Sequence, residues 1–424
     1  MNRIILSAIA AWMALGAVAQ TLDECQQAAA DNYPLIRRYD LIRSTTDLSI
    51  DNINKGWLPQ VSAYAQATIQ NKVVELPGAL TNMMTAQGYD FKGLTKEQYK
   101  AGLDITQPIY DGGRIKSQKT IAREQGVAEQ TENEVNLYGV RRRVNELYFG
   151  LLLLDDKIAL NHDMQELLLS SERQLAAMVK AGTAATSDLD AVKAQRLSVR
   201  QTEAELVSQK TALTQMLALF TGKPVTALSR PAVDSPADAV NLRPELRLID
   251  AQLRLADARE QALDAALKPT LAAFAQGYYG YPGFNMYEDM MSRTPSFNAL
   301  LGVRLSWNIG ALYTRANDKA KLQVQRRQAE NQREVFLFNN QLETTQQRER
   351  IAKYTKLKAQ DSEIIALRSS VRKAAESKLA HGIIDVNGLI QEITNENSAK
   401  IQLSTHEIEM LKEIYDLKYT LNQP

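Results

Sequence analysis

The chain has one cysteine, few aromatic residues and almost no net charge. Because Cys25 is the only cysteine among 424 residues, no disulfide can form within the chain. Aromatic residues make up 6% and there are 12 prolines, which favours a chain dominated by helix over one built from many short strands. A formal net charge of +1 gives no global field towards nucleic acid, so we expect no nucleic-acid partner.

The first residues have the composition of a secretion signal. Arg3 precedes the apolar segment "IILSAIAAWMALG", which is shorter than the roughly 20 residues needed to span a membrane. The small residues "AVA" before Gln20 suit signal cleavage. We therefore predict a signal peptide at 1–19 and export of the mature chain. Cys25 lies beyond the predicted cleavage site, and we expect it on the apolar face of a short helix.

Beyond the signal, the chain lacks long apolar runs. The longest such run is "FGLLLL", Phe149 to Leu154, far below the roughly 18 residues that indicate a membrane-spanning helix. An exported chain of this kind can enter a membrane only as a β-barrel, in which every backbone group finds a partner in a neighbouring strand.

The sequence contains an internal repeat. "WLPQVSAYAQATIQ" from Trp57 resembles "LKPTLAAFAQGYYG" from Leu267, and "VKAGTAATSDLD" around Gly182 resembles "LAHGIIDVNGLI" around Gly382. We predict two repeats, each with a strand pair and a long helical hairpin. The first repeat is 20–220 (strands about 58–109, hairpin about 114–220), a linker follows at 221–243, and the second repeat is 244–424 (strands about 269–309, hairpin about 314–421).

The predicted strands alternate between apolar and polar residues. In the first strand pair, Val61, Ala63 and Ala65 alternate with Ser62 and Tyr64, and in the second pair the alternation runs from 297 to 309. Period two over such a length is typical of membrane barrel strands. Four strands are too few to close a barrel, since the smallest have about eight. The barrel must therefore be shared between several copies of the chain.

The remaining sequence predicts very long helices. A helix from Arg114 to Lys180 would be ~100 Å long at 1.5 Å per residue. After Gly182, apolar residues recur every seven positions, at Val192, Val199, Leu206, Leu213 and Phe220. Such heptads indicate a seam packed against partner helices. We also expect the C-terminal helix, about 386–421, to stack end-on with the helix at about 34–55.

The two glycine segments are predicted to be hairpin turns. Glycine tolerates the positive φ that a helix reversal needs, which Gly182 and Gly382 would supply. After the first turn, Thr186 or Ser187 can cap the next helix, and Asp188 falls in its first turn, where the helix dipole favours a carboxylate.

No motif indicates catalysis or metal binding. His162, His381 and His406 are far apart, and none has a ligand partner four residues on. "YDGGR", from Tyr110, lacks the lysine and spacing of a phosphate loop and is better explained as a strand-to-helix turn. We therefore predict no enzymatic activity, no cofactor and no metal site.

These features together resemble a known family. The signal peptide, the duplicated plan, the pair "QPIYDGGR" and "LSWNIGALYTR", and the opening "TLDECQQAAADNYP" are similar to the outer-membrane efflux proteins, the TolC-like channels. The resemblance implies a mainly α fold with a membrane β-barrel portion. It also implies a homotrimer that closes a 12-stranded barrel in outer-membrane lipid and a 12-helix tunnel across the periplasm.

The resemblance also implies roles for the two turns. In this family the turns dock a periplasmic adaptor, which works with an inner-membrane transporter, and they narrow the tunnel to a gate. The family tends to place aspartate six residues after each turn glycine; here the second such position is Gly388. The docking candidates are Gly182, Thr183, Ser187, Leu189, Gly382, Asn387 and Leu389, and the candidates for the pore constriction are Asp188, Asp190 and Asp385.

The function that follows is a passive exit duct of a tripartite efflux system. Two alternatives remain open at this point. One is the outer-membrane duct of a type I protein-secretion system, and the other is a soluble periplasmic coiled-coil scaffold or adaptor.

Overall fold

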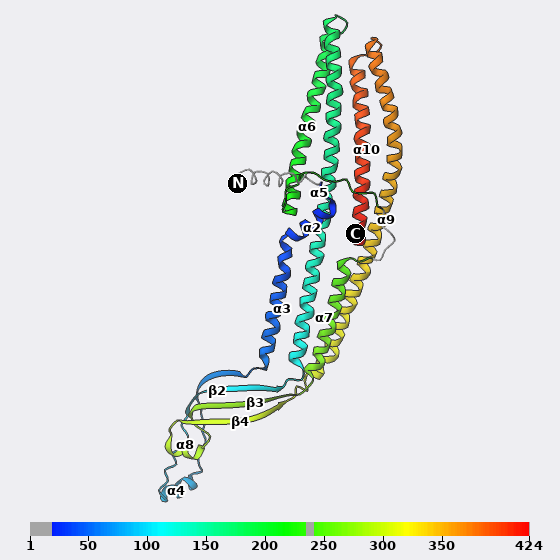
Figure 1. Ribbon diagram of the computed structural model, residues 1–424. Coiled ribbons are helices and arrows are strands. Elements are labelled where there is room, and N and C mark those ends of the chain that lie inside the picture. The colour runs from blue at the N-terminus through cyan, green and yellow to red at the C-terminus, as the bar shows by residue number, and fades with distance from the viewer. Residues whose placement is uncertain (1–18, 235–240, 424) are drawn as a thin grey trace, which may run out of the picture. The chain divides into compact units, whose positions relative to one another are not determined.

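The structure is a computed structural model that describes residues 19–234 and 241–423 (Figure 1). The predicted signal peptide lies outside the described residues except for Ala19. The chain forms two compact units, and each predicted sequence repeat contributes to both. Unit 1 takes in Met1–Tyr39, Gln130–Leu248 and Asn331–Pro424, and unit 2 takes in Asp40–Glu129 and Ile249–Glu330.

Helices dominate the described residues, as the composition predicts. The first long helix has the predicted bounds, whereas the second begins a few residues before the predicted start at about residue 314. No helix in the described part of the chain is both long and apolar enough to cross a membrane. The helices are α2 (Leu22–Asn32), α3 (Arg38–Asn54), α4 (Gly78–Ala86), α5 (Arg114–Lys180), α6 (Thr186–Thr221), α7 (Pro244–Ala266), α8 (Met286–Ser292), α9 (Ala311–Ala380) and α10 (Val386–Leu421), and the strands are β1 (Gln60–Ile69), β2 (Glu97–Tyr110), β3 (Thr270–Tyr281) and β4 (Ser296–Ser306).

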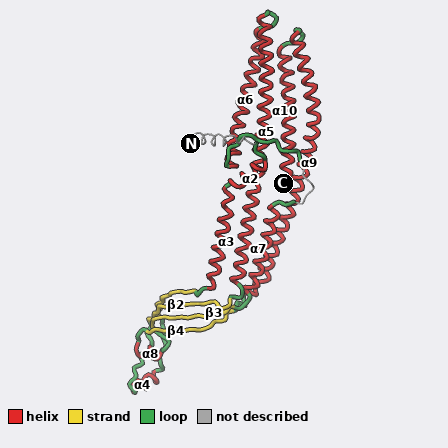
Figure 2. The backbone as a smooth tube through the Cα atoms, in the orientation of Figure 1, coloured by secondary structure: helices red, strands yellow, loops and turns green. Residues whose placement is uncertain are grey.

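Unit 1 contains the turn-side parts of two helical hairpins that lie side by side, α5 with α6 and α9 with α10, with both turns at the same end (Figures 1 and 2). Near the turns all four helices share one apolar cluster, which includes Leu168, Val192, Leu379 and Ile393. The predicted heptad seam of α6 is buried at Val192 and at Val199. Its later positions are not fully buried in a single chain.

A second apolar cluster joins α2 to α5, α6 and α10. It buries Cys25 with Val144, Leu217 and Ile408, which confirms that the cysteine lies on the apolar face of a short helix. Burial, with a smaller contribution from the neighbouring Glu24, raises the pKa of the Cys25 thiol to about 11. The thiol is therefore protonated and unreactive at neutral pH.

The helices in unit 1 do not meet end to end as the sequence analysis predicts. Asn32 at the end of α2 donates from Nδ2 to the carbonyls of Leu219 and Phe220 at 3.1 Å each, so α2 meets the end of α6. The end of α10 instead meets the residues before α7, where Asn422 Nδ2 donates to the Leu242 carbonyl at 2.7 Å. The predicted end-on contact of α10 with helix 34–55 is therefore wrong. Pro34 follows the end of α2 and interrupts that helix, because proline cannot continue it.

Unit 2 contains a four-stranded antiparallel sheet in the order β1-β2-β3-β4. The strands pair in sequence order, so β1 and β4 are edge strands without a second partner among the described residues. Large apolar side chains of β4, such as Phe297, Leu301 and Leu305, are exposed. This strand ends at Ser306, so Trp307 and Ile309 of the predicted alternation lie in the turn before α9. Helix α4 lies in the connection between β1 and β2, and helix α8 lies in the connection between β3 and β4.

The turn from β2 into α5 is built as the "YDGGR" motif predicts. Asp111 is buried, and its two carboxylate oxygens accept from the Gly113 and Ile115 N–H groups at 2.8 and 2.6 Å. Gly112 and Gly113 have φ of 71° and 88°, a conformation that glycine adopts without a steric penalty. The motif therefore caps the start of a helix.

Each hairpin carries an ion pair between its arms at the same place, with the charges exchanged. Glu172 on α5 pairs with Arg196 on α6 at 2.7 Å, and Arg372 on α9 pairs with Glu396 on α10. Both pairs join positions that match in the two repeats when they are counted from the turn glycine. Burial alone would raise the pKa of Glu396, but hydrogen bonds from Lys400 and Arg372 outweigh it and hold that pKa below its usual value.

Replacing Glu396 with Gln tests this pair. A carboxyl with a lowered pKa in the folded state stabilises the fold above its unfolded pKa, near 4.5, and loses this effect as pH falls through the folded pKa. We expect Glu396→Gln to lower the free energy of unfolding by about 2 kcal/mol at pH 7. The difference from wild type should shrink below about pH 4. Chemical denaturation followed by circular dichroism measures both, and a difference that does not change with pH would contradict the assignment.

Candidate docking site at the hairpin turns

The first hairpin reverses through a Schellman turn. Gly182 has φ of 73°. Its N–H donates to the Val179 carbonyl at 3.1 Å, and the Thr183 N–H donates to the Met178 carbonyl at 2.9 Å. These bonds satisfy the last carbonyls of α5, which is how this motif ends a helix.

The second hairpin repeats the same backbone. Gly382 has φ of 68°. Its N–H donates to the Leu379 carbonyl at 3.0 Å, and the Ile383 N–H donates to the Lys378 carbonyl at 2.9 Å. The two turns therefore have one geometry, and both glycines adopt the positive φ that the sequence predicts.

The start of α6 differs from the predicted cap. The N-cap residue is Ala185, and Thr186 is already the first helical residue. Neither Thr186 nor Ser187 caps the helix, so that prediction is wrong. Because alanine offers no side-chain acceptor, the cap comes only from Asp188, whose Oδ2 accepts from the Ala185 N–H at 3.2 Å. This is the returning half of a capping box.

At the start of α10 the capping carboxylate lies three positions earlier than at the start of α6. Asp385 is the N-cap residue, and its Oδ1 accepts from the Gly388 N–H at 2.9 Å. By the repeat, Asp385 stands where Ala185 stands in the first turn, and Gly388 stands where Asp188 stands. The second turn therefore keeps one acidic group in a capping role.

The predicted docking residues differ in exposure. The exposed ones are Gly182, Thr183, Ser187, Gly382 and Asn387, whereas Leu189 is partly buried. Leu389 is 2% exposed and packs inside the apolar cluster below the turns. In this structure it holds the hairpin together and offers no surface to a partner.

Sequence reasoning missed Ile383. Its side chain is 70% exposed at the end of the second hairpin, at the position that Thr183 takes in the first. Thr183 turns its hydroxyl back to the Met178 carbonyl at 3.1 Å, which an isoleucine cannot do. Alignment of the two repeats would have revealed this apolar substitution.

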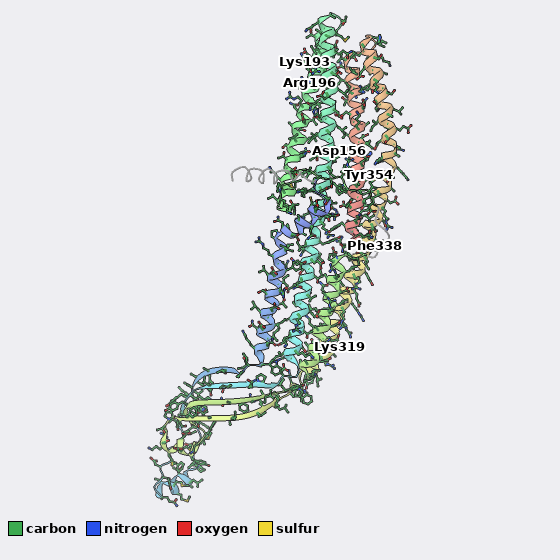
Figure 3. The ribbon with its side chains drawn as sticks, in the orientation of Figure 1. Asp156, Lys193, Arg196, Lys319, Phe338 and Tyr354 are labelled. Carbon is green, nitrogen blue, oxygen red and sulfur yellow. The ribbon has the colours of Figure 1, made fainter. Side chains whose placement is uncertain are left out.

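The remaining candidate acid lies at the helix surface. Asp190 pairs weakly with Lys193, 3.8 Å away on the exposed side of α6, and Figure 3 labels Lys193 near the end of the hairpin. Among residues 19–234 and 241–423 no group of three or more potential ligands gathers to hold a metal ion. His406 instead contacts Asp361 at 2.6 Å.

Known proteins match both this sequence and this fold. The family model described as outer membrane efflux protein matches residues 25–223. No curated protein sequence matches the chain significantly. Solved structures with the same fold include the outer-membrane channel OprN (16% identity, TM-score 0.67, 95% of this chain and 90% of that one). A second is CusC (13% identity, TM-score 0.69, 96% of this chain and 93% of that one). A third is the Campylobacter jejuni CmeC outer membrane channel (13% identity, TM-score 0.65, 94% of this chain and 85% of that one).

The chain has the fold of solved outer-membrane channels of the TolC-like class. Residues 25–223 of the chain match the outer membrane efflux protein family. Members of this family are trimeric channels of the outer membrane that extend into the periplasm and work with adaptors and inner-membrane pumps. The predicted location and the predicted lack of enzymatic activity are confirmed by this family match. The soluble-scaffold alternative is set aside.

The turn glycines can be tested by substitution. An ideal Cβ on Gly182 or on Gly382 would meet no atom within 4 Å, so the cost of alanine is the strained positive φ alone. We expect Gly182→Ala and Gly382→Ala each to destabilise the chain by about 1 kcal/mol. Gly139→Ala is the matched control, because Gly139 lies inside α5 with equal space around it. That change should stabilise the helix by about 0.5–1 kcal/mol. Equal thermal shifts for all three variants would refute the assignment.

Proposed function

We propose that the chain forms a homotrimer that serves as the outer-membrane exit duct of a tripartite efflux system. The observation that carries this proposal is the open sheet of unit 2, whose edge strands β1 and β4 each lack a second partner in the described chain. Unpaired backbone groups in lipid cost several kcal/mol each. Three copies of the four strands give a closed barrel of twelve, in which β4 of one copy pairs with β1 of the next.

The exposed turns support docking to a periplasmic adaptor. Both turns lie at one end of unit 1, and the same backbone hydrogen bonds hold both in one conformation. Rigid, preorganised surfaces lose little entropy on binding. The docking surface of the proposal consists of Gly182, Thr183, Ser187, Gly382 and Asn387, with Ile383 added from the structure, and the inner-membrane pump binds through the adaptor.

Photo-cross-linking tests the docking. A photo-reactive residue at Thr183 should capture an adaptor in living cells, and a linked pump should be recovered with it. The same residue at Asp51, exposed on α3 in unit 2, is the control and should not capture the adaptor. If position 183 captures nothing, or captures no more than position 51, the docking proposal fails.

We assign Asp188, Asp190 and Asp385 to an acidic constriction at the tunnel mouth. Three copies of each would gather negative charge in a narrow space, which raises the local concentration of cations. Asp188 and Asp385 are held in place by their bonds to Ala185 and to Gly388. The two hairpins therefore contribute their capping carboxylates from different positions.

Single-channel recording tests the constriction. We expect Asp188→Asn to weaken block by divalent cations several-fold, because it removes one charge per copy while the amide keeps the size of the side chain. Asp51→Asn, a distant exposed acid, should leave the block unchanged. An unchanged block in Asp188→Asn would remove this residue from the constriction.

The type I secretion duct remains the second candidate function. It uses the same conduit and differs in the partner at the turns. The capture at position 183 therefore separates the two, since the pump recovered with the adaptor would be an exporter of proteins in that case.

A further inference from the structure

A cavity lies within unit 1 where side chains of α2, α5 and α10 come together. Its volume is about 300 Å³, which is at the small end of the range for ligand sites. Its lining is mostly polar and aromatic, and it includes Asp23 and Gln27 from α2, Arg141 from α5, and Tyr415, Lys418 and Tyr419 from α10. The size and the lining suit a small polar ligand.

Buried polar contacts join the three helices beside this cavity. Asn145 on α5 is fully buried, and its Oδ1 accepts from Gln26 Nε2 on α2 at 2.6 Å. Its Nδ2 donates to Asp416 Oδ1 on α10 at 3.5 Å. Residues three or four positions apart lie on one face of a helix, so Asp23 lies one turn from Gln26, and Arg141 lies one turn from Asn145. Both charged side chains therefore line the same cavity.

These two opposite charges have no charged partner in the part of the chain that the structure describes. Asp23 is exposed and Arg141 is partly buried. Neither side chain forms an ion pair or a hydrogen bond with another described residue, and they do not pair with each other. The Arg141 guanidinium lies over the Tyr138 ring, 5.4 Å from its centroid. A contact with a ring face leaves the N–H groups at the edge of the guanidinium open to a carboxylate.

The third charged residue of the cavity, Lys418, is already compensated. Its Nζ donates to Asp234 Oδ2 at 3.2 Å and lies 5.0 Å from the centroid of the Tyr415 ring. Burial raises the pKa of the Tyr415 hydroxyl, and the negative charges of Asp23 and Asp234 add to this rise. The Asp23 carboxylate therefore acts on the aromatic wall of the cavity. Asp23 and Arg141 remain as its two uncompensated charges.

We propose that this cavity binds a small zwitterion, an amino acid or a dipeptide, whose carboxylate pairs with Arg141 and whose ammonium group pairs with Asp23. A simple anion would be repelled by Asp23 and a simple cation by Arg141, so a ligand that carries both charges is favoured over either. Each pair then forms a charge-assisted hydrogen bond. The cavity lies within one copy of the chain, so the proposal does not rest on the homotrimer.

Ligand-observed nuclear magnetic resonance on the full chain in a nonionic detergent tests the site, with L-alanine and L-alanyl-L-alanine as probes. At least one probe should bind saturably. Arg141→Gln and Asp23→Asn should each weaken that binding about tenfold, since each removes one charged hydrogen bond. Arg142→Gln is the matched control, because Arg142 is the next residue on α5, is exposed, and lies 3.9 and 4.0 Å from its partners Glu146 and Glu343. This control should bind the probe as the unsubstituted chain does.

A probe that lacks one charge separates a direct contact from a change in the fold. N-acetyl-L-alanyl-L-alanine has no ammonium group, so Asp23→Asn should not weaken its binding, whereas Arg141→Gln should. If Asp23→Asn weakens the acetylated probe as much as the dipeptide, the substitution acts through α2 and the proposed contact is wrong. Absence of saturable binding to the unsubstituted chain, or binding that Arg141→Gln and Asp23→Asn leave unchanged, would overturn the proposal.

Discussion

The unpaired edges of the four-stranded sheet are the constraint on which the rest of the structure depends. Strands β2 and β3 are each hydrogen-bonded on both sides, whereas β1 and β4 each have one side without a strand partner among the described residues. Water can satisfy such a row, but lipid cannot. In the proposed channel the missing strands therefore come from other copies of the chain.

Each long hairpin needs contacts that keep its two helical arms together along their length. Apolar clusters near the turns and beside α2 hold them at separate levels. Cross-arm ion pairs such as Glu172–Arg196 and Arg372–Glu396 add specific contacts between the arms. The exchanged charges show that the two repeats kept the interaction while changing the residues that make it.

Much of this architecture follows from local sequence rules. Helix bounds such as Arg114–Lys180 were predicted because glycine and the heptad pattern act locally. The N-cap residue of α6 was not predicted correctly, because the turn geometry and not the residue type places Ala185 at that position. The contact of α10 with the residues before α7 was missed for a related reason. It joins residues that are far apart in the sequence, which no periodicity reports.

The candidate site shows the same division. The turn glycines and Asp188 were found from the sequence, but the burial of Leu389 and the exposure of Ile383 needed three-dimensional packing.

The proposed channel requires three copies of the chain to close one barrel. Native mass spectrometry of the chain extracted from outer membranes in mild detergent measures this directly. The proposed channel should be extracted as a species of three chains, and a monomer or a dimer as the extracted form would contradict it.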